Sequence, residues 1–469
     1  MISPSLHPAP LSAVCERRRR WSFGLTPRSI GLLIAGFIWL VPGFWDKRLT
    51  YAMPAWDGLV LLFALLDGLR LPDAADLTTS RSWLNAPALG GETEIELTIE
   101  NQGRMIVDCR LVDDLPPALV AEPETLRLTA FPHVPAKLRY RIEPKERGDW
   151  ETGWLYVRYR SGLGLAEHWA RARLTQIVRV YPALRTSEEQ QIFLARSRQI
   201  ELQLRRAQQR GLGRDFESLR EYREGDDLRD ICWTATARRG SLITRQYQTE
   251  RSQPVWIVLD CGRLMRARVA MEQSPNNSGP APSSKLDHAC TTAVALAQLA
   301  LYSGDRVGLL AYGQNIQQRL LPGRGAAHQR QLIELLAQVH TESGEADHLR
   351  ATATLNRLQP RRSLILWVTD LAETAMRPEV IDGALQLLRR HVLLFVAMAQ
   401  PEVEQIAQAR PIDLEQMFRA SAAQEMAGRR ELLLARLHEQ GALTLDLNPE
   451  ALTSSVLNQY LTVKERAMV

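Results

Sequence analysis

The stretch VWIVLDCGRLM, residues 255–265, begins with five apolar residues, and this run ends at Asp260. A short apolar run of this kind is typical of a strand that is buried on both faces of a sheet. In open α/β sheets, ligands bind beyond the carboxyl ends of the strands. Asp260 is therefore a candidate ligand for a metal ion or a phosphate group.

Similar apolar runs recur towards the C-terminus and alternate with amphipathic helical patterns. This alternation predicts an α/β domain with a doubly wound parallel sheet over residues 252–469. The predicted strands are residues 255–260, 307–312, 364–369, 392–396 and 443–445, and the predicted helices are residues 285–302, 326–339, 378–390 and 429–440. A segment rich in Pro, Ser and Asn, residues 272–285, predicts a mobile loop after the first strand.

Upstream of this domain the apolar residues alternate with polar ones. The alternation is clear in TEIELTIE (residues 93–100), KLRYRIE (137–143) and WLYVRYR (154–160). Half-buried antiparallel strands show this period of two. We therefore predict a β-sandwich domain over residues 71–182. A charged connector over residues 183–251 follows it and begins with a polar helical pattern over residues 187–210.

The amino-terminal region carries two apolar segments. Residues 29–45, SIGLLIAGFIWLVPGFW, hold no charge, and residues 51–69 hold only Asp57 and Asp67. The first segment reaches the short end of a bilayer span, and the second has a shorter uninterrupted centre. Basic residues within the first 28 residues favour a cytoplasmic N-terminus, so a two-span hairpin over residues 29–70 would leave the later domains in the cytoplasm. The alternatives are a secretory signal that ends near YAMPA, or one span with an exported domain.

Composition excludes several classes of protein. The 469 residues predict two or three domains, and the net charge is +5. Only five of the 58 basic residues are Lys, and 53 acidic residues are mixed among them, which is typical of a solvated surface and not of a nucleic-acid interface. The five cysteines are scattered without a CxxC pair. Their pattern argues against structural zinc and disulfides and fits a reducing compartment.

The connector contains GRDFESLREYREGDDLRDICWTATARRGSLITRQYQTE, residues 213–250. Asp226 or Asp227 can cap a helix that ends before Gly240. Trp233 lies off its apolar face and is predicted to be exposed unless another surface covers it. The segment is either a solvated, salt-bridged connector or an ordered charged surface that docks a partner or a neighbouring domain. The expected apolar face consists of Leu228, Ile231, Cys232 and Ala235.

This motif resembles the bacterial family known as domain of unknown function 58. Family members combine a membrane hairpin, a β-rich segment similar to residues 147–165 here, the motif, and a von Willebrand factor A-like domain. The resemblance implies association with MoxR-type AAA+ ATPases, other von Willebrand factor A-like proteins and transglutaminase-like membrane proteins. It suggests a role in an ATPase-linked assembly or maturation system at the bacterial inner membrane. The matching residues are Phe216, Leu219, Arg220, Tyr222, Gly225, Asp226, Arg229, Ile231, Trp233, Ala237 and Arg238.

A von Willebrand factor A-like domain often carries a metal-ion-dependent adhesion site with a D-x-S-x-S loop, a Thr from a second loop and an Asp from a third. Asp260 and Asp370 match the two aspartates of this pattern, but Gly262 and Leu264 replace the serines. We assign the second loop to LPGRGAAHQR, residues 321–330, which holds no Thr or Ser. Magnesium requires near-octahedral oxygen ligands. We therefore predict a remnant site without Mg²⁺ or Mn²⁺, in which both aspartates act as caps or pair with Arg. Arg263 is one such candidate partner for Asp260.

The leading hypothesis is a membrane-anchored, non-catalytic interaction or scaffold protein that docks a MoxR-type AAA+ ATPase or a membrane partner through the motif. The rival hypothesis is a metal-dependent hydrolase that uses Asp260, Asp370 and one of Asp226 and Asp227. The chain lacks a G-x-S-x-G nucleophile elbow, and GLGRDF (residues 211–216) follows a helical pattern instead of a strand. A third hypothesis is a cell-envelope adhesion protein, which requires the single-span topology.

Overall fold

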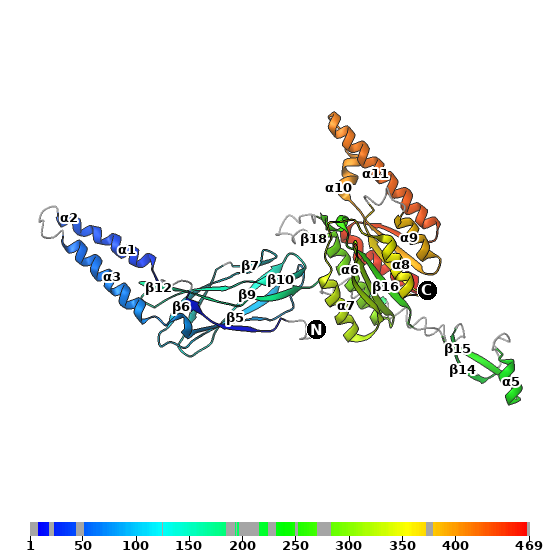
Figure 1. Cartoon of the computed structure of the whole chain (residues 1–469), viewed down its shortest axis with the longest axis horizontal. Coiled ribbons are helices and arrows are strands. Elements are labelled where there is room, and N and C mark those ends of the chain that lie inside the picture. The colour runs from blue at the N-terminus through cyan, green and yellow to red at the C-terminus, as the bar shows by residue number, and fades with distance from the viewer. Residues whose placement is uncertain are drawn as a thin grey trace. The chain divides into compact units, whose positions relative to one another are not determined.

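The computed structural model describes residues 8–17, 23–43, 51–123, 125–183, 193, 195–196, 215–223, 231–248, 252–269, 283–371 and 379–466. The chain divides into two compact units, Met1–Ala183 and Leu184–Val469 (Figure 1). All five cysteines are free and buried.

The first unit contains two antiparallel sheets and a pair of apolar helices. One sheet has the strand order β1-β4-β5-β9-β7, and the other has the order β2-β12-β11-β6-β8 with β3 beside β12. The first sheet consists of β1 (Leu11–Val14), β4 (Leu77–Trp83), β5 (Thr93–Asn101), β9 (Ala136–Pro144) and β7 (Leu119–Glu122). The second consists of β2 (Glu16–Arg17), β3 (Phe23–Leu25), β12 (Ala166–Ala172), β11 (Leu155–Arg160), β6 (Val107–Asp113) and β8 (Leu126–Ala130). A separate pair is formed by β10 (Gly148–Thr152) and β13 (Gln176–Val180), and a short 3₁₀ turn, η4 (Ala74–Asp76), precedes β4.

The period of two in the sequence sets the core between these sheets. Ile95 and Leu97 of β5 and Leu155 of β11 are fully buried in one cluster. An ion pair between Arg81 of β4 and Asp113 of β6 joins the two sheets inside this core. Such a pair specifies how the sheets are aligned, because an unpaired partner would leave a buried charge.

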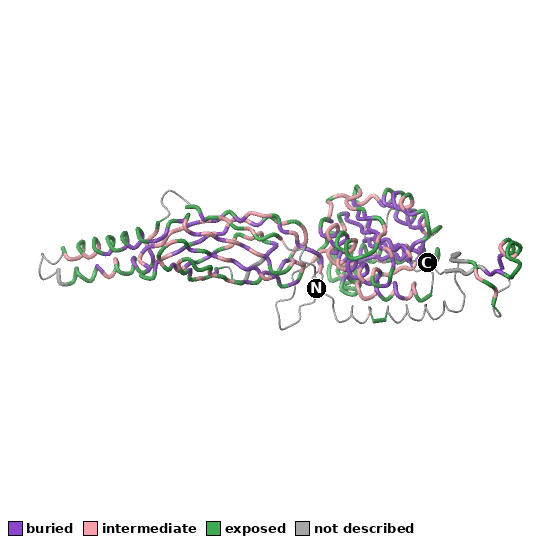
Figure 2. Tube along the Cα trace, turned by 90° about the horizontal axis from the view of Figure 1, so that it is seen from below, coloured by how far each residue is buried: buried purple, intermediate pink, exposed green. Residues whose placement is uncertain are grey.

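The apolar helices form an antiparallel hairpin. The first arm comprises α1 (Pro27–Gly36), η2 (Phe37–Trp39) and α2 (Leu40–Gly43), and the second is α3 (Ala52–Arg70). Figure 2 shows that both arms are largely exposed, unlike the sheets. Among the described residues, one helix, α3, is long and apolar enough to cross a membrane by length and composition. The sequence made the second apolar segment the weaker candidate for a membrane span, and this ranking is wrong. Gly36, Pro42 and Gly43 accompany breaks in the first arm, whereas α3 runs without interruption.

Asp67, an acidic residue within α3, binds the turn between β11 and β12. Its carboxylate accepts hydrogen bonds from Ser161 Oγ at 2.6 Å, from the Leu165 amide at 3.0 Å and from the Ala166 amide at 3.2 Å. The residue is only 2% exposed. The carboxylate is satisfied by the sandwich and not by solvent, which explains its place in an apolar helix.

The other arm holds the same turn from a second direction. Thr26, the N-cap of α1, donates a hydrogen bond from its hydroxyl to the Gly164 carbonyl at 2.5 Å. Ser29 donates to the Leu165 carbonyl. Gly164 has a φ of +63°, a conformation that favours glycine. Both helices are thus hydrogen-bonded to one turn of the sandwich.

We expect Asp67→Ala to loosen this joint. Hydrogen bonds to a charged acceptor contribute about 1.5–3 kcal/mol each, and their donors would be left buried. Amide hydrogen exchange of Leu165 and Ala166 in the detergent-solubilised chain should accelerate by about tenfold or more, the equivalent of about 1.4 kcal/mol. Asp57→Ala on the same helix is the control. Equal exchange in the two variants would contradict the joint.

The second unit is built around a six-stranded sheet with the order β20-β19-β16-β21-β22-β23. Its parallel strands are β16 (Pro254–Asp260), β19 (Arg306–Tyr312), β21 (Leu364–Thr369), β22 (Val392–Met398) and β23 (Leu443–Leu447), and β20 (Ile316–Gly323) is the antiparallel edge. The helices are α6 (Lys285–Tyr302), α7 (Gly325–Gln338), α8 (His348–Leu358), α9 (Glu379–Leu388), α10 (Pro401–Gln408), α11 (Leu414–Glu439) and α12 (Leu452–Glu465). Short elements are η6 (Arg263–Arg266), β17 (Arg268–Val269), β18 (Ser283–Ser284) and η8 (Pro449–Ala451).

Helices cover both faces of this sheet. Residues of α8, α9 and the C-terminal half of α11 pack in one apolar cluster with side chains of β16, β19, β21 and β22. Helix α6 lies against β16 and β19 and contacts α12 and α7. The strand β16 is buried along its whole length, so Asp260 at its end lies below the surface of the protein.

Candidate functional site

Asp260 and Asp370 lie at the carboxyl ends of the neighbouring strands β16 and β21. The Asp260 carboxylate accepts hydrogen bonds from the Gly262 amide at 2.7 Å and from the Thr369 hydroxyl at 2.6 Å. Burial raises the pKa of Asp260 to about 6, although both hydrogen bonds oppose the rise; the charges of Asp370 and Glu342 add to it. Asp260 therefore caps its own turn and holds the end of β21.

A lysine ammonium neutralises Asp370. Lys285 Nζ donates to Asp370 Oδ2 at 2.6 Å, and the two side chains are 3% and 0% exposed. Gln400 Nε2 lies 3.0 Å from the same oxygen, and an Arg430 guanidinium nitrogen lies 3.7 Å from Asp370 Oδ1. The positive charge that a divalent cation would supply is thus supplied by the chain itself.

The sequence pattern did not identify Lys285 as part of this site. The residue begins α6, whose N-terminus is capped by a reciprocal pair, Ser284 and Asp287. A buried ammonium at the positive end of a helix dipole requires a carboxylate partner. The one available signal was a Lys at the first turn of a predicted helix that follows the strand ending in Asp260, in a chain with only five Lys.

The assignment of the second loop to LPGRGAAHQR is wrong. Residues 321–323 end the edge strand β20, and residues 325–330 lie in α7. The segment beside Asp260 is residues 339–347: the Glu342 amide donates to the Cys261 carbonyl at 2.8 Å, and the Arg263 amide donates to the Gly344 carbonyl at 2.9 Å. The error arose because β20 was not predicted, which displaced the expected loop by one connection.

Two other features of the loop at residues 260–264 follow from this packing. A Cβ atom at Gly262 would lie 2.9 Å from the Ala346 amide nitrogen and 3.1 Å from Asp260 Oδ1, so a serine does not fit there without a shift of the loop. Arg263 does not pair with Asp260 as the sequence suggested; its guanidinium lies 3.9 Å from Glu345 Oε1, and both side chains are half exposed. The sheet edge is closed by backbone contacts and an internal ion pair.

Replacing the ammonium should destabilise the domain strongly. We expect Lys285→Met to lower the free energy of unfolding by about 3–5 kcal/mol, because Asp370 would remain buried without its close cationic partner. Native-state hydrogen exchange of the β21 amides in the full chain measures this loss. Lys285→Met combined with Asp370→Asn is the matched control and should recover most of the loss. Millimolar Mg²⁺ should stabilise only the single variant, and stabilisation of the unmodified protein would contradict an internal cation.

Asp260 should make stability fall as the pH rises. Its pKa in the folded protein, about 6, lies above the ordinary value of 3.8, so the folded state binds this proton more tightly than the unfolded chain. The stabilisation is present below about pH 4 and is lost as the pH rises to about 6; a difference of this size corresponds to about 3 kcal/mol. Relative to Asp260→Asn, the unmodified protein should lose this amount over that range. Parallel stability profiles for the two proteins would show that Asp260 is not responsible.

The motif segment forms a small separate element. Strands β14 (Asp215–Glu221) and β15 (Ile243–Gln248) pair antiparallel, and α5 (Trp233–Arg239) precedes β15. Phe216, Leu219 and Arg220 lie in β14. The Tyr222 amide donates to the Leu242 carbonyl at 2.9 Å.

The prediction of a helix that begins at Asp226 or Asp227 is not supported as far as the segment is described. Ile231 pairs with Thr244 as an isolated β-bridge, and the Cys232 amide donates to the Ile243 carbonyl, so α5 begins only at Trp233. At Ile231 and Cys232, pairing with β15 replaces the helix that the local pattern favours. The motif positions Gly225, Asp226, Asp227, Leu228 and Arg229 lie outside the described residues.

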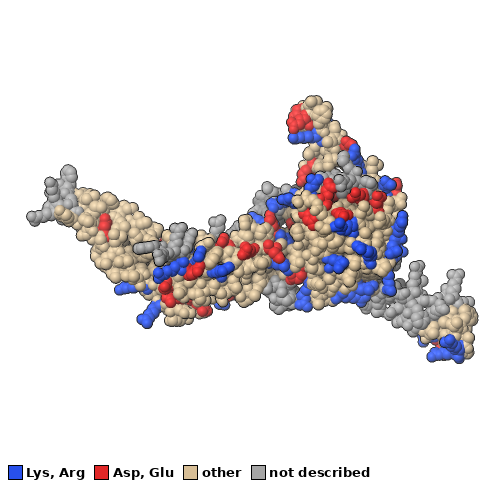
Figure 3. All heavy atoms as spheres, in the orientation of Figure 1, with Lys and Arg blue, Asp and Glu red and all other residues tan. Residues whose placement is uncertain are grey.

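The surface of α5 combines an aromatic ring with basic residues. Trp233, which was predicted to lie off the apolar face, is 67% exposed. Arg238 and Arg239 in the last turn are exposed, and basic atoms gather at this end of the segment in Figure 3. Gly240 ends the helix with a φ of +71°. Ile231, Cys232 and Ile243 are buried beneath, so Trp233 is not needed to fill the core of the segment.

Comparison with known proteins supports the family resemblance. Residues 218–422 match the family model described as "Protein of unknown function DUF58". The uncharacterized proteins Rv1480 of Mycobacterium tuberculosis and Mb1516 of Mycobacterium bovis are each 26% identical over 195 residues, which is 41% of this chain. The matched region spans 56% of the length of these relatives.

Solved structures give only distant likenesses. The conserved hypothetical protein BatB from Bacteroides thetaiotaomicron covers 46% of this chain and 100% of its own, at 12% identity and a TM-score of 0.28. An uncharacterized membrane spanning protein from Vibrio fischeri covers 44% of this chain and 96% of its own, at 13% identity and a TM-score of 0.17. Neither likeness is close enough to support an argument about fold or function.

Proposed function

We propose that this chain is a membrane-anchored, non-catalytic scaffold that docks a partner through α5, and that the partner is a MoxR-type AAA+ ATPase or a membrane protein of the same assembly system. The observation that carries the proposal is the exposure of Trp233 beside Arg238 and Arg239. Trp and Arg are enriched among the residues that dominate binding energy at protein interfaces. An exposed tryptophan that no core requires is therefore best explained by a partner.

The Lys285–Asp370 pair supports a non-catalytic role. A metal-dependent hydrolase built on Asp260 and Asp370 needs a cation with an open coordination position for water or substrate. Here the ammonium of Lys285 lies 2.6 Å from Asp370, and both carboxylates are already bound by donors from the chain. This arrangement favours a structural role for the two aspartates over the hydrolase alternative.

The apolar hairpin supports anchoring in the bacterial inner membrane with the larger domains in the cytoplasm. Large apolar side chains project from both arms, among them Ile34, Phe37, Leu62 and Phe63, each more than half exposed. Figure 3 shows an almost uncharged surface along α1 and α3. Lipid would cover this surface, whereas water would leave it unfavourably solvated. The basic residues before the hairpin favour a cytoplasmic N-terminus.

The docking role predicts that partner capture depends on α5. Full-length protein in native membranes is crosslinked with and without ATP, and the amount of co-purified AAA+ ATPase is measured. We expect Trp233→Ala with Arg238→Glu to reduce it by about tenfold or more, as loss of an aromatic anchor does. Leu432→Ala, which removes an exposed apolar side chain from α11, is the control. ATPase recovery that is equal in both variants, or absent from the unmodified protein, would contradict the proposal.

A further inference from the structure

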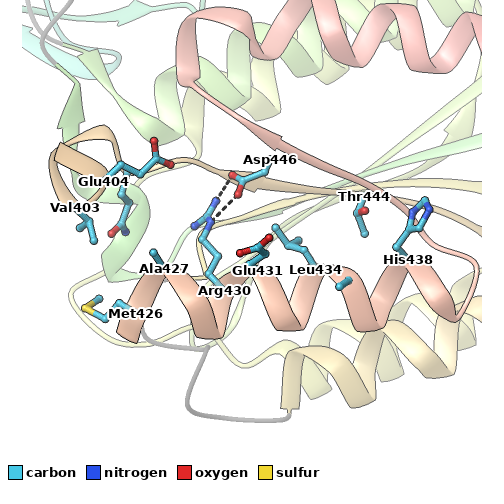
Figure 4. A pocket seen from close by; sticks show the side chains of 12 residues that line it. Val403, Glu404, Met426, Ala427, Arg430, Glu431, Leu434, His438, Thr444 and Asp446 are labelled. Carbon is cyan, nitrogen blue, oxygen red and sulfur yellow. Dashed lines mark hydrogen bonds and ion pairs between the residues drawn. The ribbon is translucent and has the colours of Figure 1, made fainter. Parts of the chain in front are cut away.

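A groove of about 550 Å³ lies between α10, α11 and the edge strand β23. Its lining includes the apolar side chains of Val403, Met426 and Leu434 (Figure 4). Glu404 of α10 and Glu431 of α11 also line it. A groove of this size accommodates a large side chain together with part of the helix that carries it.

The charge of this groove is unbalanced. Asp446 is neutralised by Arg430, whose guanidinium nitrogens lie 2.6 and 3.0 Å from its two carboxylate oxygens. Glu404 and Glu431 are exposed, and neither makes an ion pair with any residue that the structure describes. The groove therefore presents two carboxylates without ion-pair partners beside the apolar side chains of Val403, Met426 and Leu434. It fits a segment that offers an aromatic or aliphatic side chain and two cations.

Helix α5 offers this chemistry. Trp233 and Ala237 are one turn apart on the same side of the helix, and both are exposed. Arg238 and Arg239 follow in the last turn, where the exposed guanidiniums can reach carboxylates at the rim of a groove. The two surfaces are complementary in polarity and in the sign and number of their charges, and every copy of the chain carries both.

We propose that the groove between α10, α11 and β23 receives helix α5 of a second copy of this chain. The geometry of the β14–β15 hairpin favours a second copy. Helix α5 adjoins the first residue of β15, and the chain continues from the last residue of β15 towards β16. Strand β15, six residues long, thus places α5 about 20 Å from the point where the chain leaves the hairpin towards β16. The contact joins unlike surfaces, so it propagates head to tail from copy to copy.

This inference goes beyond the proposed function, which assigns no role to the groove; it rests on that function only in treating α5 as a docking surface. A crosslinking experiment with two differently tagged full-length chains, co-reconstituted in detergent micelles, tests it. One chain carries Ala237→Cys, which leaves Trp233 in place. The other carries Ala435→Cys in the groove, or, as the control, Leu321→Cys on β20, at the opposite edge of the sheet. The native cysteines are all buried.

A short bis-maleimide should join the two tags through Ala435→Cys at least about tenfold more efficiently than through Leu321→Cys. Equal yields or no product would overturn the proposal. So would a third chain that carries both Ala237→Cys and Ala435→Cys, if its crosslink forms only within the chain. Charge reversal supplies the second arm. Glu404→Arg with Glu431→Arg should abolish the product, and adding Arg238→Glu with Arg239→Glu on the other chain should restore it.

The same variants separate this inference from the proposed function. If α5 binds only an outside ATPase, capture of the ATPase responds to the α5 changes, the groove changes have no effect, and no product joins the tags. If α5 binds only a second copy, the tags are joined and the charge reversals restore each other, while ATPase recovery does not depend on α5. Melting temperatures of the surface variants should match that of the unmodified protein. A lower melting temperature would show that a variant lost the crosslinked product because it was unfolded.

Discussion

The ion pair between Lys285 and Asp370 is the interaction on which the carboxyl edge of the α/β sheet depends. It joins the first turn of α6 to the end of β21, in a place where neither charge reaches water. Taking these two groups out of water is costly, and only close geometry with further hydrogen bonds offsets that cost. Gln400 supplies one of these bonds, and Arg430 adds a second positive charge from α11. The position of Arg430 then determines the groove, because the same guanidinium binds Asp446 of β23.

Much of the α/β sheet could be predicted because its strands are buried on both faces. Continuous apolar runs mark β16, β19, β21 and β22, and the helical pattern over residues 285–302 has the same bounds as α6. The edge strand β20 escaped prediction because IQQRLLPG is polar on its exposed side, and its absence misplaced the loop beside Asp260. Helix α11 begins at Leu414 and not near Arg429. Leu414, Met417 and Phe418 have helical spacing in the sequence, but their side chains are exposed and do not join the core.

The candidate site could be predicted only in part, for a physical reason. Asp260 and Asp370 were recognisable because each ends a buried strand, and local pattern locates strand ends. Lys285 was not, because its burial depends on where α6 starts relative to β21, which is a tertiary fact. Tertiary contacts also override the local pattern in the motif. Ile231 and Cys232 fit a helix locally, yet pairing with β15 determines their conformation. Local propensity is a weak predictor wherever a strand offers its backbone.

If both proposals hold, the outside partner and the groove of a second copy compete for α5. Trp233 would then be shared between an outside partner and a second copy of the chain, and one helix cannot occupy two sites. Each would therefore lower the apparent affinity of the other, to an extent set by its own concentration and dissociation constant. Local concentration on a membrane would favour the self-contact, so the partner would have to exceed it in affinity or abundance. Under both proposals, α5 would leave the groove of the second copy only where the partner is present.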